Sequence, residues 1–169
     1  GENGCILHYI ENEEQIGPDD LVLIDAGCEY EMFNGDISRT FPASGKFTAP
    51  QRAVYEVVLE AQISSIEKCT TENTMNDVHE HALKILIDGM IDLKLLEGTA
   101  DEVIEKETYK KFYMHKTGHF LGVDVHDVGN PRKGTEWRKF EPGMVTTVEP
   151  GIYIPVDAEN IPDEFRGIG

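Results

Sequence analysis

The sequence predicts an α+β fold, because strand-like segments begin and end the chain and two helical segments lie between them. Strand and helix do not alternate regularly, so a parallel βαβ sheet is not expected. Of the 169 residues, 40% are hydrophobic, and they are spread along the chain rather than gathered in one block. This is enough for one continuous domain with its own core.

The first strands are predicted from short apolar runs bounded by turn residues. Residues 5–9 form one such run, and residues 21–24, Leu-Val-Leu-Ile, follow a turn signal at residues 17–20. The second run is compact and rich in apolar residues, which predicts a buried strand. An alternating pattern resumes at residues 37–41 and stops at Pro42. Together these runs predict a hairpin or meander.

From Pro50 onward the period of the apolar residues changes to three and four, which predicts an amphipathic helix to about Cys69. A second helix is expected after Thr74, since Thr is a good N-cap and Asp77 stands three positions later. Residues 101–106 predict a short helical turn. Residues 144–149 and 152–154, separated by Pro150 and Gly151, predict the last two strands. The apolar face of the second helix comprises Val78, Ala82, Ile85, Leu86 and Met90.

The chain is strongly acidic, with 15 Lys and Arg against 32 Asp and Glu, a formal charge of −17. This argues against nucleic acid and anionic membranes as partners, because both are bound through clustered basic residues. No apolar run approaches the ~18 residues that span a bilayer. The three cysteines form no CxxC motif, which favours a reducing compartment, and we expect the cytoplasm.

Two aspartates flank the predicted hairpin, Asp25 at the end of one strand and Asp36 just before the next. An antiparallel pairing would place both carboxylates on one face, where they would repel each other unless cations lie between them. The alternative is structural, with Asp25 capping the turn at Gly27 and Asp36 completing an Asn-Gly-Asp turn. Taken alone, the two residues favour the structural alternative.

Three of the six histidines, His115, His119 and His126, lie within residues 114–129. Any one of them could be an ordinary hydrogen-bonded residue, but three together, with Asp124 and Asp127 alongside, are better explained by a site. Imidazole is a common metal ligand, and a neighbouring acid usually fixes its tautomer.

Glu149 lies at the end of an alternating segment and is followed by Pro150 and Gly151, which predicts a carboxylate in a rigid position. Its structural alternative is a surface turn glutamate. If Asp25, Asp36, His119 and Glu149 converge, they offer oxygen atoms and one nitrogen. That donor set suits Mn²⁺, Co²⁺, Fe²⁺ or Zn²⁺ better than a structural, cysteine-rich zinc site.

The same segments resemble the creatinase/aminopeptidase family of dinuclear metallopeptidases, which has the pita-bread fold. The signature blocks are residues 21–27, 35–42, 118–127 and 149–153, in the family's order and across nearly the whole chain. Within the family, residues 1–9 and 124–129 look most like Xaa-Pro aminopeptidases, also called aminopeptidase P.

The resemblance implies ligands for two metal ions, usually Mn²⁺ in this family, with Co²⁺ or Zn²⁺ as alternatives. Asp25 would bind in bidentate fashion and Asp36 would bridge the two ions; His119 and Glu149 complete the metal ligands present. Glu149 would also transfer protons, and His115 and His126 would lie near the scissile bond. The residues implied to line the substrate pocket are His8, His115, His126 and Tyr153.

The implied reaction is hydrolysis of the bond between an N-terminal residue and a following proline, so the partners would be peptides with proline at the second position. A prolidase that cleaves Xaa-Pro dipeptides is the alternative enzyme, and a pita-bread binding module without catalysis is the third reading. We also expect truncation at both ends, with residues 1–169 forming a partial catalytic domain. Such a fragment would lack a bridging Glu ligand and the N-terminal domain through which a homo-oligomer could form. Alone, it would bind metal weakly and hydrolyse Xaa-Pro peptides poorly or not at all.

Overall fold

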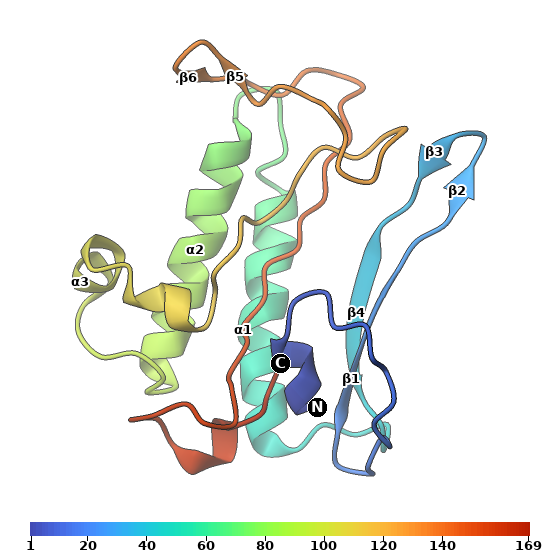
Figure 1. Ribbon diagram of the computed structural model, residues 1–169. Helices are drawn as coiled ribbons and strands as arrows, with labels where there is room; N and C mark the ends of the chain where they lie inside the picture. Colours follow the sequence, from blue (N-terminus) through green and yellow to red (C-terminus); the bar gives the residue numbers. More distant parts are fainter.

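A computed structural model describes residues 1–169, and two long helices form its centre (Figure 1). The helices α1 (Ala49–Ile66) and α2 (Met75–Asp92) run antiparallel and pack against each other. Helix α3 (Ala100–Glu105) follows, and three short 3₁₀ helices, η1 (Glu2–Cys5), η2 (Thr108–Lys111) and η3 (Asp163–Phe165), lie outside this pair. No helix has the length and apolar character needed to cross a membrane.

Each α-helix begins at a threonine capping box. Thr74 accepts a hydrogen bond from the Asp77 N–H while the Asp77 side chain accepts from the Thr74 N–H, which confirms the expected N-cap. Thr48 and Thr99 begin α1 and α3 in the same way. Helix α1 ends at Ile66, three residues before the expected Cys69, and α3 confirms the short helical turn predicted at residues 101–106.

Helices α1 and α2 approach closely at Gly89. A Cβ atom added to Gly89 would lie 2.4 Å from Cγ1 of Val57, so only glycine fits there without movement. This close approach brings the apolar face of α2 against α1.

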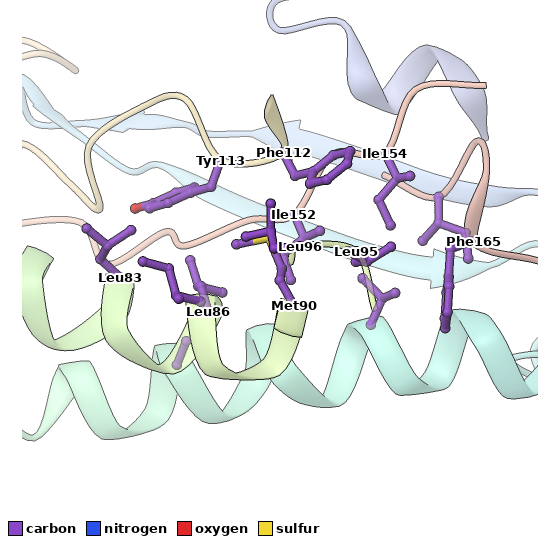
Figure 2. Close-up of a cluster of buried hydrophobic side chains, with 14 of the residues drawn as sticks. Leu83, Leu86, Met90, Leu95, Leu96, Phe112, Tyr113, Ile152, Ile154 and Phe165 are labelled. Carbon is purple, nitrogen blue, oxygen red and sulfur yellow. The ribbon is translucent and has the colours of Figure 1, made fainter. Parts of the chain in front are cut away.

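The core lies between α2 and the extended segments that cross it. Figure 2 shows Leu83, Leu86 and Met90 of α2 pointing toward Phe112, Tyr113 and Ile152. Sixteen buried residues form this cluster, and Leu21 joins it from the first strand. Burial of this apolar area is the main driving force for the fold.

A long hairpin stands beside the helices (Figure 1). Strand β1 (Leu21–Ala26) pairs antiparallel with β4 (Ile37–Pro42), and the short strands β2 (Glu29–Tyr30) and β3 (Phe33–Asn34) pair near its tip. The expected hairpin is therefore confirmed. The expected burial of residues 21–24 is confirmed only at Leu21, because β1 pairs with β4 alone and the rest of the run is half-buried or exposed. Ile24 and Ile37, which share one face of the hairpin, are 47% and 57% exposed.

Three other expected strands are absent. Cys5 ends η1, and residues 6–8 form a bend and turn in which His8 has a left-handed φ of 57°. Residues 145–149 lie antiparallel to residues 117–121, with an isolated bridge between Thr146 and Phe120, but this pairing is too short to form a strand. Residues 152–154 are extended and form no strand, because their backbone hydrogen bonds go to two separate partners, Phe112 and Ile168. The Val148 carbonyl accepts from the Gln62 side chain, and the Tyr153 N–H donates to Phe112. A small hairpin that the sequence did not predict joins β5 (Arg132–Lys133) and β6 (Glu136–Trp137).

Candidate metal centre

Three of the expected ligands converge in the structure. The ligand atoms of Asp36, His119 and Glu149 all lie within 4.8 Å of one another. The Nε2 atom of His119 is 3.3 Å from Oδ2 of Asp36 and 3.2 Å from Oε1 of Glu149. All three residues are only partly buried, so the cluster is open to solvent on one side.

The tautomer of His119 makes this cluster suited to a cation. Its Nδ1 atom is 2.9 Å from the carbonyl oxygen of Phe120, which can only accept, so Nδ1–H is the donor. A neutral ring then directs the lone pair of Nε2 at two carboxylate oxygens. Three acceptors that close repel one another unless a proton or a metal ion lies between them. Two carboxylates and one imidazole match the ligand preference of Mn²⁺, Co²⁺ or Zn²⁺.

Two extended segments, residues 117–121 and 145–149, position His119 and Glu149. The Thr147 N–H donates to the His119 carbonyl (3.0 Å), and the Glu149 N–H donates to the Thr117 carbonyl (2.7 Å). A Cβ atom on Gly118 would lie 2.1 Å from the Thr147 carbonyl oxygen, so the two segments could not approach this closely with any other residue at position 118.

The hydroxyl of Thr147 joins the two ligands directly. It donates to Oε1 of Glu149 (2.6 Å) and accepts from the His119 N–H (3.0 Å). Sequence reasoning missed this role. The signal was present, since Thr147 lies two residues before Glu149 in an extended segment and therefore points to the same face.

Asp36 comes from the hairpin, which is anchored to the rest of the chain at its tip. The Asn34 N–H donates to the Gly122 carbonyl (2.8 Å), and the Asn34 side-chain amide donates to the Val123 carbonyl. A Cβ atom on Gly27 would lie 1.9 Å from the Gly35 carbonyl oxygen, so the two sides of the hairpin are in close contact immediately before Asp36.

Asp25 lies outside the three-residue cluster. The register pairs Asp25 with Ser38 and Ala26 with Ile37, and one further step places Gly27 opposite Asp36. Asp25 and Asp36 are therefore diagonal neighbours on the same face, a relation that separates Cβ atoms by about 7 Å. Two aspartates at that separation can direct their carboxylates at a common cation or at two adjacent cations.

His115 contacts Tyr153 next to this cluster. Its Nδ1 atom is 2.8 Å from the carbonyl oxygen of Lys116, and its Nε2 atom is 2.8 Å from the Tyr153 hydroxyl. The carbonyl fixes Nδ1 as the donor, so the hydroxyl donates to Nε2. Burial raises the pKa of Tyr153 to about 12, and the negative charges of Glu149 and Asp25 add to the shift. Tyr153 therefore keeps its proton at neutral pH.

The remaining expected site residues differ in their placement. The ring of His126 stands edge-on to that of His119, with 4.4 Å between the centroids, although His126 itself is exposed. His8 is exposed, and its side chain has no hydrogen bond or ion pair in the structure. Neither Asp124 nor Asp127 hydrogen-bonds a histidine side chain. The expectation that a nearby acid fixes the tautomer is wrong for His119, since the Phe120 carbonyl does so.

Comparison with known proteins gives a consistent set of matches. The model of metallopeptidase family M24 matches residues 1–169. The chain is 50% identical to the Xaa-Pro aminopeptidase of Haemophilus influenzae over 169 residues, which is 100% of the chain and 39% of the relative. It superposes on the Pseudomonas aeruginosa aminopeptidase PepP with a TM-score of 0.97 and 51% identity, covering 100% of the chain and 38% of that structure.

A variant of Escherichia coli aminopeptidase P in complex with substrate is also similar, with a TM-score of 0.95 and 48% identity. The match covers 100% of the present chain and 38% of that structure. The structural matches confirm the predicted α+β, pita-bread class. The chain spans about two fifths of the length of these relatives, 39% of the first and 38% of both structures.

Proposed function

The chain belongs to metallopeptidase family M24, and on that premise we propose that it forms part of the catalytic domain of an Xaa-Pro aminopeptidase. The substrates would be peptides with proline at the second position. The observation that carries this proposal is the convergence of two carboxylates on Nε2 of His119, at 3.2 and 3.3 Å. The similarity to Xaa-Pro aminopeptidases supports the same assignment.

The residues that would hold two divalent ions are Asp25, Asp36, His119 and Glu149. We propose Mn²⁺ as the native metal, with Co²⁺ or Zn²⁺ as alternatives. When bound, such ions lower the pKa of a water molecule and polarise the scissile carbonyl. The fixed tautomer of His119 presents its lone pair for this purpose without rearrangement.

Glu149 would accept a proton from the attacking water and pass it to the proline nitrogen as the peptide bond breaks. The Thr147 hydroxyl already donates to Oε1 of Glu149, which leaves Oε2 as the oxygen that carries the proton. His126 and His115 would lie close to the scissile bond. The Tyr153 hydroxyl orients His115 and stays protonated because of its raised pKa.

The bond before proline is a tertiary amide, which has no N–H for an enzyme to recognise. The pocket must therefore select the shape of the proline ring and the free amino terminus of the peptide. The acidic chain, with a net charge of −17, attracts that ammonium group. His8 would join the pocket from the N-terminal segment. A cytoplasmic location is part of this proposal and rests on the three unpaired cysteines.

The decisive experiment is steady-state kinetics of the intact protein with Mn²⁺ supplied, comparing Xaa-Pro-Xaa tripeptides with Xaa-Pro dipeptides. Cleavage of tripeptides is expected. Cleavage of dipeptides alone would assign a prolidase instead. Binding of Mn²⁺ without cleavage of either substrate would identify a non-catalytic module, and failure to bind Mn²⁺ or Co²⁺ would rule out both enzymes.

A further inference from the structure

A buried polar cluster lies behind the metal centre and takes no part in the proposed chemistry. The Thr117 hydroxyl is 2.9 Å from Nδ1 of His79 and 2.7 Å from the Tyr113 hydroxyl. Thr117 and Tyr113 are 2% and 0% exposed, and His79 on helix α2 is 8% exposed. Buried polar groups are costly unless they are hydrogen-bonded, so the three side chains depend on one another.

The Thr117 hydroxyl is the only group that bonds both of the others. A hydroxyl can donate one proton and accept two hydrogen bonds, so Thr117 can bond both neighbours at once. Burial lowers the pKa of His79 to about 4, and the nearby positive charge of Lys116 acts in the same direction. The His79 ring is therefore neutral near pH 7, and the cluster is a hydrogen-bonded set of three uncharged side chains.

The backbone of Thr117 connects this cluster to the metal ligands. Its carbonyl accepts the Glu149 N–H at 2.7 Å, and His119 is two residues further along the same extended segment. Gly118, between them, lies against Thr147 with no room for a side chain. A shift of Thr117 would therefore move His119 and Glu149 together relative to Asp36, which comes from the separate hairpin.

We propose that Thr117 is a positioning residue for the metal centre, held on helix α2 by His79 and on the core by Tyr113. This inference rests on the proposed function, since it assumes that Asp36, His119 and Glu149 bind metal. It assigns a role to three residues that touch no metal ligand through their side chains. Residues that orient metal ligands typically alter metal affinity by about 10- to 100-fold when replaced.

The test compares variants of the intact protein that remove or keep the Thr117 hydroxyl. Thr117→Val keeps the shape of the side chain and removes the hydrogen bonds, whereas Thr117→Ser keeps the hydroxyl. Ser65→Ala is the matched control, because Ser65 on α1 is 0% exposed and its hydroxyl has no partner. Co²⁺ affinity is measured by calorimetry, and ligand geometry is monitored by the visible absorption of bound Co²⁺.

We expect Thr117→Val to weaken Co²⁺ binding by at least about 10-fold and to change the absorption spectrum. Its kcat should fall while KM changes little, because the peptide contacts remain. Thr117→Ser and Ser65→Ala should retain the affinity and the spectrum of the unmodified protein. If Thr117→Val does not fold, Tyr113→Phe removes one of the two hydrogen bonds and should give a smaller change in the same direction.

Unchanged Co²⁺ affinity and spectrum in folded Thr117→Val, or in Tyr113→Phe where the first does not fold, would overturn the inference. Equal weakening of Co²⁺ binding in Ser65→Ala would also overturn the inference, since the effect would then be general destabilisation. If the unmodified protein binds no metal, the proposed function fails instead, and the two failures are thereby distinguished.

Discussion

The Tyr153 hydroxyl lies 2.8 Å from Nε2 of His115 and donates to it, because the other ring nitrogen of His115 is already bonded to the Lys116 carbonyl. This bond fixes the orientation of one of the two histidines proposed to lie near the scissile bond. It also connects that histidine to the buried segment that contains Ile152 and Ile154.

Replacement of Tyr153 by Phe should therefore lower kcat/KM for Xaa-Pro-Xaa peptides by about 10-fold, since the His115 ring loses the partner that orients it. Metal content should not change, because neither residue belongs to the converging ligand cluster. Tyr55→Phe is the control, since Tyr55 packs on Phe47 and its hydroxyl has no hydrogen bond. An equal loss in both variants would contradict the role given to Tyr153.

Metal removal should lower thermal stability. Asp36, His119 and Glu149 come from separate segments, and without a cation their two carboxylates face an imidazole lone pair. A ligand present at 100 times its Kd stabilises the folded state by about 2.7 kcal/mol, so a chelator should lower Tm by several degrees. Scanning calorimetry with and without Mn²⁺ measures this shift.

The control variants for metal removal are both histidine substitutions. His119→Ala should abolish the effect of Mn²⁺ on Tm, whereas His81→Ala on helix α2, outside the converging cluster, should preserve it. A Tm that responds to Mn²⁺ equally in His119→Ala would show that the ion binds elsewhere.

Stability should decrease as the pH falls from about 7 to 5, because of His79. Burial lowers its pKa from 6.5 to about 4 in the folded state. Between these values the unfolded chain binds more protons than the folded chain, so the free energy of unfolding decreases as the pH decreases. Restricting denaturant titrations to pH 5–7 avoids Asp77 and Glu102, whose pKa values are lowered by their capping hydrogen bonds and affect stability only at more acidic pH.

His79→Gln removes the titrating group and should flatten this pH dependence, although it should also lower stability at pH 7 through loss of the bond to Thr117. The slope, rather than the absolute stability, is the diagnostic quantity. An unchanged slope between pH 5 and 7 in His79→Gln would assign the effect to other groups.

Gly89→Ala should destabilise the fold by about 1–3 kcal/mol through overpacking. Alanine is the better helix former by about 1 kcal/mol, but its Cβ would lie 2.4 Å from Cγ1 of Val57. Val57→Ala removes that methyl group, so the double variant should be more stable than the sum of the single effects predicts. Additive effects in urea unfolding would show that the helices can separate without cost.

Local signals allowed much of the fold to be predicted. The Thr74 cap depends on Asp77 three residues away, and the hairpin depends on alternation and turn residues within one segment, so both were visible in the sequence. The burial of residues 21–24 was not predictable in this way. It depends on which element covers each face of β1, and only Leu21 reaches the core.

For the site, the types of the ligand residues could be predicted from the sequence, whereas contacts between distant segments could not. Residue types and segment ends indicated Asp25, Asp36, His119 and Glu149 as a set, and the structure brings the last three together. Thr147 and the His79–Thr117 bond were missed, because they depend on contacts between distant segments; the latter spans 38 positions. No pattern within one segment indicates such a pairing.

The β1–β4 hairpin is attached to the rest of the chain chiefly at its ends, through Leu21 in the core and Asn34 at the Gly122–Val123 turn. Between these anchors, most of its backbone could open without disturbing the helices. A cation shared by Asp36, His119 and Glu149 would add a third anchor. Metal occupancy should then slow amide hydrogen exchange along Ile37–Pro42, so that backbone protons which contact no ligand report whether the centre is filled.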